Sequence, residues 1–156
     1  MLGFTRYDAA FFAALMSTAV ALGASLAHLF ELPNKIDLGR DAYFTVQGIY
    51  RGRNQLAYVL AIEFVSIIAT IILSRDARQV RLWAAVALLS LVAAQAVFWT
   101  FTYPANVATN NWTAIPADWE TLRRQSEYSH AAGAIFQLIA MTSLVIAALK
   151  RRSPAA

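Results

Sequence analysis

Hydrophobic residues are gathered into four long runs, at residues 9–30, 55–74, 82–102 and 130–149. Each run reaches the roughly 20 residues that a helix needs to cross about 30 Å of hydrocarbon. None of the four contains lysine or arginine, and Glu63 is the only acidic residue within them. Because backbone polar groups inside a bilayer must satisfy one another, we expect four transmembrane helices.

The composition agrees with this interpretation, since 59% of the residues are hydrophobic and only 14% are charged. We predict an all-α fold, a bundle of four transmembrane helices that forms a single integral membrane domain over residues 1–156. The sequence has no cysteine, which excludes disulfides, thiol catalysis and thiolate metal sites.

Basic residues predict the orientation of the bundle. Three arginines lie between the second and third runs, residues 150–152 are all basic, and Arg6 precedes the first run. By the positive-inside rule these segments and both termini are cytoplasmic. On the opposite side, acidic residues offset the bases. The net charge of +4 is therefore a topology signal and gives no reason to expect nucleic-acid binding.

The two connections on the outer side are expected to contain further helix. Apolar residues recur at helical spacing over residues 41–50, behind a candidate cap at Asp41, which predicts a short helix in the membrane interface. Pro116, followed by Asp118 and Glu120, predicts that the fourth helix begins well outside the membrane.

The chain has two histidines, and each stands three residues from a glutamate: His28-x-x-Glu31 and Glu127-x-x-His130. Residues three apart share a helix face. Counting about 1.5 Å per residue from the inner boundary puts both histidines at one height near the outer face. Ionisable groups at such positions are functional candidates, so we predict that all four residues are catalytic. The alternative is an interfacial hydrogen bond that fixes helix rotation.

Glu63 is expected in a second polar layer near the membrane midplane, together with Gln95 and Gln137. Trp99 would lie between the two layers. Glu63 is either a further catalytic residue or a neutral, protonated carboxyl bonded to one of the two glutamines.

Several stretches outside the apolar cores form a recognisable pattern. They are residues 28–35, 46–54, 104–106, 111–112, 116–119, 122–123 and 127–131. In these stretches the chain resembles the anthrone-oxygenase-like family of integral membrane proteins, and it is most similar to a bacterial branch. It departs from the family pattern at Arg53 and Ser126, where tryptophan is expected, and at residues 131–133, which lack a basic residue.

The resemblance implies a four-span membrane fold and, from some fungal members, the oxygenation of anthrones to anthraquinones. It also implies a multi-pass protein of the bacterial inner membrane, with the bilayer and a lipophilic aromatic molecule as partners; a homo-oligomer is left open. The predicted substrate-binding residues are Asn34, Gln47, Tyr50, Asn54, Trp99, Asn106, Asn111, Trp112, Trp119 and Arg123.

We therefore expect a membrane-embedded oxidoreductase, an oxygenase that acts on a lipophilic aromatic or quinol-like molecule. In one mechanism a histidine or glutamate removes a proton, and the resulting anion reacts with oxygen without a cofactor. In the other, His28 and His130 hold a single metal ion or a haem iron, with Glu31 and Glu127 beside it. A di-iron centre is less favoured, because Glu63 lies too deep to complete it.

A different class of function also fits the sequence. The chain could be a non-catalytic membrane subunit whose outer polar surface binds a ligand, including haem or metal, or a partner protein.

Overall fold

The computed structural model describes residues 4–50 and 52–151, with the side chain of Arg53 left out. Arg51, which belongs to the family-like pattern, and Arg152 of the basic tail lie outside the described residues. The described part is helical and contains no strand. Its elements are α1 (Arg6–Lys35), α2 (Arg40–Gln47), η1 (Gly48–Tyr50), η2 (Arg53–Gln55), α3 (Leu56–Leu73), α4 (Arg78–Val97), η3 (Phe98–Thr102), α5 (Tyr103–Ala108) and α6 (Trp119–Arg151).

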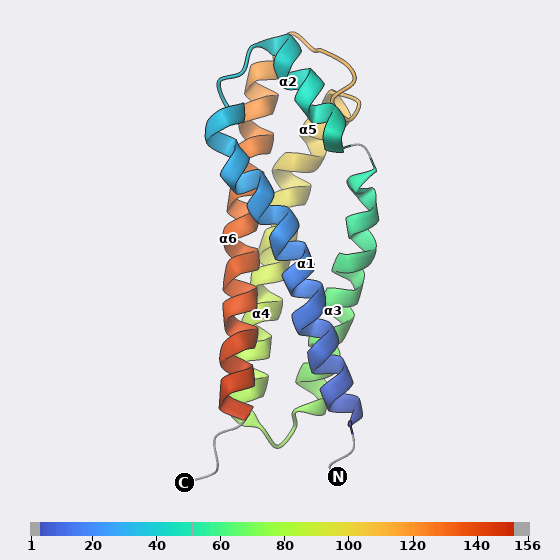
Figure 1. Cartoon of the computed structure of the whole chain (residues 1–156), viewed down its shortest axis with the longest axis vertical. Helices are drawn as coiled ribbons and strands as arrows, with labels where there is room; N and C mark the ends of the chain where they lie inside the picture. Colours follow the sequence, from blue (N-terminus) through green and yellow to red (C-terminus); the bar gives the residue numbers. More distant parts are fainter. Residues whose placement is uncertain (1–3, 51, 152–156) are drawn as a thin grey trace.

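Four helices are long and apolar enough to cross a membrane. They are Arg6–Lys35, Leu56–Leu73, Arg78–Ala108 and Trp119–Arg151, so each contains or nearly matches one of the predicted runs. The prediction of an all-α membrane bundle is confirmed at this level. The first residues of α1 and the last residues of α6 lie at the same end of the bundle (Figure 1).

Small buried residues allow the helices to pack closely. Helix α6 packs on α4 and α1, and α3 packs on α1 and α4. Their shared core is formed by Ala14, Ile67, Ala87, Leu91, Ala140 and Leu144. Alanine lets helix backbones approach, which drives association where lipid offers no hydrophobic force between helices.

Large apolar side chains cover the outside of the same helices. Exposed examples are Phe12, Met16, Val20, Ile62, Val65, Ile72, Leu89, Val92 and Ile135. A soluble protein rarely exposes so much apolar surface, whereas a membrane protein turns it to lipid. The outer surface therefore agrees with the apolar length of the helices.

The helix that begins at Arg78 changes its winding near its far end. Residues Phe98–Thr102 form a π-helical turn, η3, directly before Pro104 in α5. A proline ring in a regular α-helix would clash with the carbonyl of residue 100, four positions earlier, and the wider turn relieves that clash. Gln125 of α6 donates to the Phe101 carbonyl (2.8 Å), and the Thr102 and Ser129 hydroxyls are 2.6 Å apart, so η3 is held against α6.

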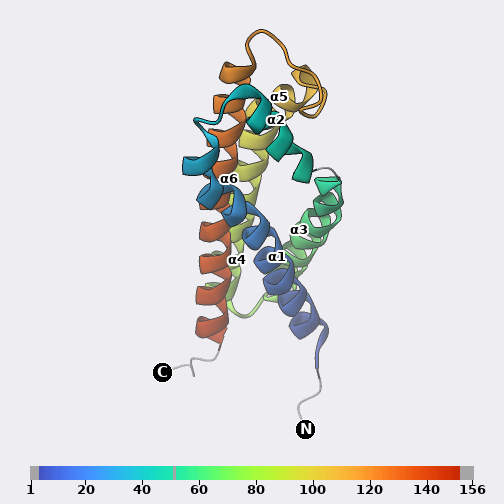
Figure 2. The same cartoon turned by 45° about the horizontal axis from the view of Figure 1, so that its top comes forward.

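A layer of loops and short helices covers the end of the bundle opposite the termini. It contains α2, which begins one residue before the segment expected to be helical and ends within it, and the connection from α5 to α6 (Figures 1 and 2). Helix α6 begins at Trp119, close to the predicted start after Pro116. This layer brings α2 next to the ends of α1 and α6.

Replacing Ala87 by leucine tests the close packing of α4. Ala87 is fully buried, so the larger side chain should lower the free energy of unfolding in lipid or detergent by about 1–3 kcal/mol. Ala96→Leu on the exposed face of the same helix is the matched control and should leave stability unchanged. Equal effects of the two substitutions would contradict the described packing.

Candidate functional site

A buried lysine is the centre of the polar cluster at this end of the bundle. Lys35 is only 3% exposed. Its Nζ lies 3.1 Å from a Glu127 carboxylate oxygen, 3.4 Å from Glu31, 3.0 Å from the Tyr50 hydroxyl and 3.3 Å from His28 Nδ1. One ammonium group thus contacts four polar side chains. We call Lys35 and these four residues the Lys35 cluster.

The sequence of α1 explains why three of these residues meet. His28, Glu31 and Lys35 follow one another at intervals of three and four, so they share one face of the helix. Lys35 stands in the last turn, where a positive charge also interacts favourably with the helix dipole. Its long side chain reaches Glu127 on α6.

Glu127 receives hydrogen bonds from α2 as well as the ion pair from α1. The Tyr43 hydroxyl donates to Glu127 Oε1 (2.8 Å), and Gln47 Nε2 donates to the same oxygen (3.0 Å). Tyr43 and Gln47 are four residues apart and therefore face the same way. All three side chains are buried, so Glu127 joins α1, α2 and α6 in a region with little access to water.

The environment raises the pKa of both tyrosines on the connecting segment. For Tyr43 the largest cause is burial, followed by the charge of Glu127, and the pKa moves far above its usual range. For Tyr50 burial is again the largest cause, followed by its hydrogen bond to Glu31. Both phenols therefore remain protonated donors at neutral pH.

The two histidines lie against each other in the structure. The rings of His28 and His130 stack with centroids 4.2 Å apart and planes only 3° from parallel. His28 also contacts the Tyr50 ring, at 4.6 Å. The histidines are thus at one height, as counting along the helices suggested. Glu31 and Glu127 both contact Lys35, so the two glutamates share one cation.

The arrangement does not fit a metal or haem iron held by both histidines. A ligating imidazole points a nitrogen lone pair at the metal from about 2.0–2.1 Å, within the plane of its ring. Two parallel, stacked rings direct their lone pairs along parallel planes, which do not converge on one ion. In addition, the Lys35 ammonium lies at His28 Nδ1. No group of three or more histidine, aspartate or glutamate side chains suited to a metal occurs among residues 4–50 and 52–151.

Glu63 lies apart from the Lys35 cluster. Its carboxyl is completely buried, and Gln137 Nε2 donates to its Oε2 (3.2 Å). Gln137 is seven residues beyond His130 on α6, which corresponds to roughly 10 Å along the helix. Glu63 therefore belongs to a separate inner layer and is not in the set formed by the histidines.

Aromatic side chains cover the cluster from above. Tyr43 and Phe44 of α2 pack against Trp112 and Trp119, with centroid distances between 5.2 and 6.2 Å. Arg123 is buried beneath them, with its guanidinium 4.7 Å from the centroid of the Trp119 ring and its Nη1 donating to the Leu38 carbonyl. Four of the predicted binding residues therefore contact this part of the site. Gln47 contacts Glu127, and Tyr43 is contacted by Trp112, Trp119 and Arg123.

The position of Trp112 requires an uncommon backbone conformation. Asn110, Asn111 and Trp112 have φ angles of 47°, 54° and 63°, a left-handed region that a bulky residue such as tryptophan seldom adopts. Hydrogen bonds hold the turn: Trp112 Nε1 donates to Asn106 Oδ1 (2.9 Å), and its backbone N–H donates to Thr109 Oγ1 (3.1 Å). Asn106 therefore has a structural role in positioning Trp112.

The structure does not bring the remaining predicted binding residues to the cluster. Asn34, Asn54 and Asn111 are exposed. Trp99 is 58% exposed and packs on Phe98 and Tyr103 at the outer surface of the helix, which is typical of tryptophan near a membrane boundary.

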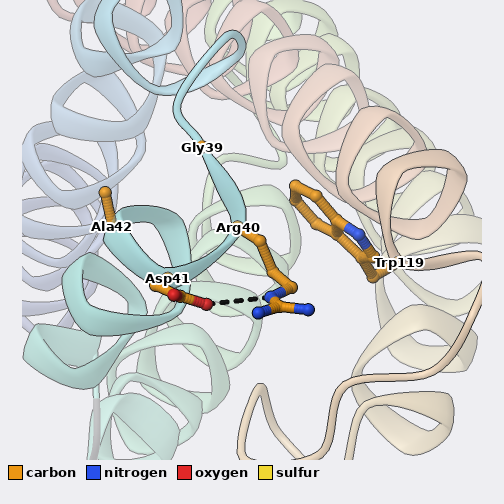
Figure 3. Close-up of a pocket in the computed structure, with 5 residues that line it drawn as sticks. All are labelled: Gly39, Arg40, Asp41, Ala42 and Trp119. Carbon is orange, nitrogen blue, oxygen red and sulfur yellow. Dashed lines mark hydrogen bonds and ion pairs between the residues drawn. The ribbon is translucent and has the colours of Figure 1, made fainter.

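A shallow hollow of about 460 Å³ lies on the covering layer, lined by Gly39, Arg40, Asp41, Ala42 and Trp119 (Figure 3). Arg40 and Asp41 form an ion pair beside the Trp119 ring, and both are exposed. A second hollow lies at the other end of the bundle, near Asp8 and Arg151. Neither is lined by a histidine or by Lys35.

Two central residues were absent from the sequence-based prediction of the site. Lys35 stands among the outer-side bases and in the family-like stretch 28–35, and Tyr43 stands among the apolar residues of the short helix expected over residues 41–50. The i,i+4 spacing of Glu31 and Lys35, and that of Tyr43 and Gln47, were the signals available in the sequence.

Comparisons with known proteins add no assignment, since no protein-family model, curated protein or solved structure matches the chain. The likeness to the anthrone-oxygenase-like family therefore rests on the sequence stretches given above.

Replacing Lys35 by methionine tests the centre of the cluster. The change leaves Glu127 buried without its cation, so we expect the free energy of unfolding to fall by about 3–5 kcal/mol. Adding Glu127→Gln should recover part of this loss. Lys150→Met, at an exposed lysine of α6, is the matched control and should behave as wild type. Additive losses in the double variant would show that the two residues are not coupled.

Alkaline pH tests the environment of Tyr43. Its pKa is raised in the folded state above the ordinary value of 10.0, so its contribution is full below about pH 10 and is lost as the pH rises further. Tyr43→Phe should cost about 1.5–3 kcal/mol at neutral pH and should weaken the decline in stability above about pH 10. Tyr58→Phe, at an exposed tyrosine, should keep the wild-type decline. An identical decline in wild type and Tyr43→Phe would refute this account.

Proposed function

We propose that the chain is a membrane-embedded oxidoreductase that oxygenates a lipophilic aromatic or quinol-like molecule. The protein removes a proton from this substrate, and the resulting anion reacts with O₂ without a metal. The observation that carries this proposal is the stacked His28–His130 pair, joined through His28 Nδ1 to the buried Lys35 cluster. The resemblance to anthrone oxygenases supports the reaction class.

The hydrogen-bond role of His28 follows from its contact with Lys35. A charged lysine only donates, so His28 Nδ1 accepts, and the hydrogen of a neutral His28 ring stands on Nε2. His28 is then suited to donate to a substrate oxygen. His130, stacked beside it, is the proposed general base.

The chemistry requires only the substrate, oxygen and a proton acceptor. His130 removes a proton from an acidic CH₂ group between aromatic rings, and the N–H of His28 and the charge of Lys35 stabilise the negative charge on the conjugated oxygen. The carbanion transfers an electron to O₂, and the two radicals combine to a peroxide, which His130 protonates. Loss of the second C–H proton and of hydroxide breaks the O–O bond, so that CH₂ and O₂ become C=O and H₂O.

One observation favours a second candidate, a non-catalytic membrane subunit. Glu127 contacts both Lys35 and Tyr43 directly, and the two described hollows lie elsewhere. In that role the cluster would hold the outer layer in shape for a ligand or a partner protein.

Turnover of a hydroxyanthrone in proteoliposomes separates the two candidates. We expect oxygen uptake with formation of the quinone, and one atom of labelled O₂ in the new carbonyl. His28→Gln and His130→Gln should each lower the rate at least about 100-fold while the unfolding temperature stays close to that of wild type. Ser90→Ala is the control, because that hydroxyl bonds only the backbone of its own helix among its described contacts.

Retention of activity in both histidine variants would refute the proposed roles. Absence of any oxygen uptake by the intact wild-type protein with hydroxyanthrones and quinols would favour the non-catalytic subunit.

A further inference from the structure

Glu63 is the one acidic residue in the four apolar runs, which contain no lysine or arginine. A free glutamate is ionised in water at neutral pH, but this side chain is fully buried. Its side chain and that of Thr18 on α1 are fully buried, and Gln137 on α6 is nearly so. Gln137 Nε2 donates to Glu63 Oε2 (3.2 Å), and Thr18 faces the same carboxyl. Residues from three helices therefore meet here.

Three oxygen atoms of this group lack a hydrogen-bond partner within the described residues. They are Glu63 Oε1, Thr18 Oγ1 and Gln137 Oε1, and all three atoms are buried. A buried hydroxyl group without a hydrogen-bond partner is destabilising, and an isolated buried carboxylate is more so. The set therefore requires an additional positive or hydrogen-bonding species.

No described charged side chain supplies it. The titratable groups of α1 nearest to Thr18 are Asp8 and His28, each ten positions away. On α6 they are His130 and Lys150, and in the helix from Arg78 to Ala108 none stands between Arg81 and Tyr103. On α3 itself the other titratable group is the exposed Tyr58. An ionised Glu63 would thus be an uncompensated charge near the midplane.

We propose that Glu63 is a proton-binding site, with an exchangeable proton on Oε1 shared with Thr18. The proton removes the charge, gives Thr18 Oγ1 a donor and leaves Oε2 as the acceptor for Gln137. The site lies roughly 10 Å from the histidines, and the inference does not depend on the proposed function. Buried carboxyls that exchange protons inside a bilayer are the elements from which proton relays are built.

Infrared spectroscopy of the full chain in lipid nanodiscs tests the proton directly. The wild type should show the carbonyl band of a buried protonated carboxyl, which shifts in D₂O. The band should be missing in Glu63→Gln and retained in Glu120→Gln, the matched control at an exposed carboxyl of α6. A wild-type spectrum without this band would overturn the proposal.

Labelling with dicyclohexylcarbodiimide, which enters lipid and reacts with protonated carboxyls, tests exchange. We expect one label per chain at Glu63 by mass spectrometry, falling as pH is raised, and at least tenfold less in Glu63→Gln. Gln137→Leu removes the donor to the carboxylate and should extend labelling to higher pH. Labelling that does not change with pH would contradict proton exchange at Glu63. Protection from labelling by NaCl but not by choline chloride would overturn the proposal in favour of a sodium-binding site.

Discussion

The ion pair between Lys35 and Glu127 is the interaction on which the outer half of the structure depends. Both side chains are removed from water, and moving either charge there alone would be costly. The charges are tolerated because Tyr43, Gln47 and Tyr50 supply further hydrogen bonds. Lys35 lies on α1 and Glu127 on α6, and the three hydrogen-bonding partners lie on the segment between α1 and α3. The pair therefore fixes how the covering layer sits on the bundle.

The sequence was sufficient for the helices but not for the contacts among their side chains. Apolar runs of about 20 residues have one stable solution in lipid, so the four spans could be predicted. The matched height of His28 and His130 followed from the helix rise, and the contact of Glu63 with Gln137 was one of two alternatives. The stacking of the histidines and the central role of Lys35 depend on helix rotation, which spacing within a single helix does not determine.

The bundle contains two layers of buried polar side chains, and they accommodate ionisable groups in different ways. Near the covering layer, charges are retained and neutralised in pairs, and aromatic rings such as Trp119 shield the buried cation Arg123. In the inner layer none of the described residues brings an opposite charge to Glu63, which has an amide and a hydroxyl group as neighbours instead. Ionised groups suit the stabilisation of a reacting anion, whereas a neutral carboxyl suits proton storage.

The π-helical turn before Pro104 also determines which face of its helix points inward. Buried positions keep helical spacing along α4 at Val80, Ala84, Ala87, Leu91 and Ala94, and again at Thr102 in η3, Ala105 and Thr109. A π-helical turn contains about one residue more than an α-helical turn, so the residues after η3 are rotated by about 100° from where an unbroken α-helix would place them. A deletion of one residue within η3 would rewind the helix as a regular one and rotate everything after it. Insertions and deletions in this short stretch would change the lining of the bundle without altering a single side chain elsewhere.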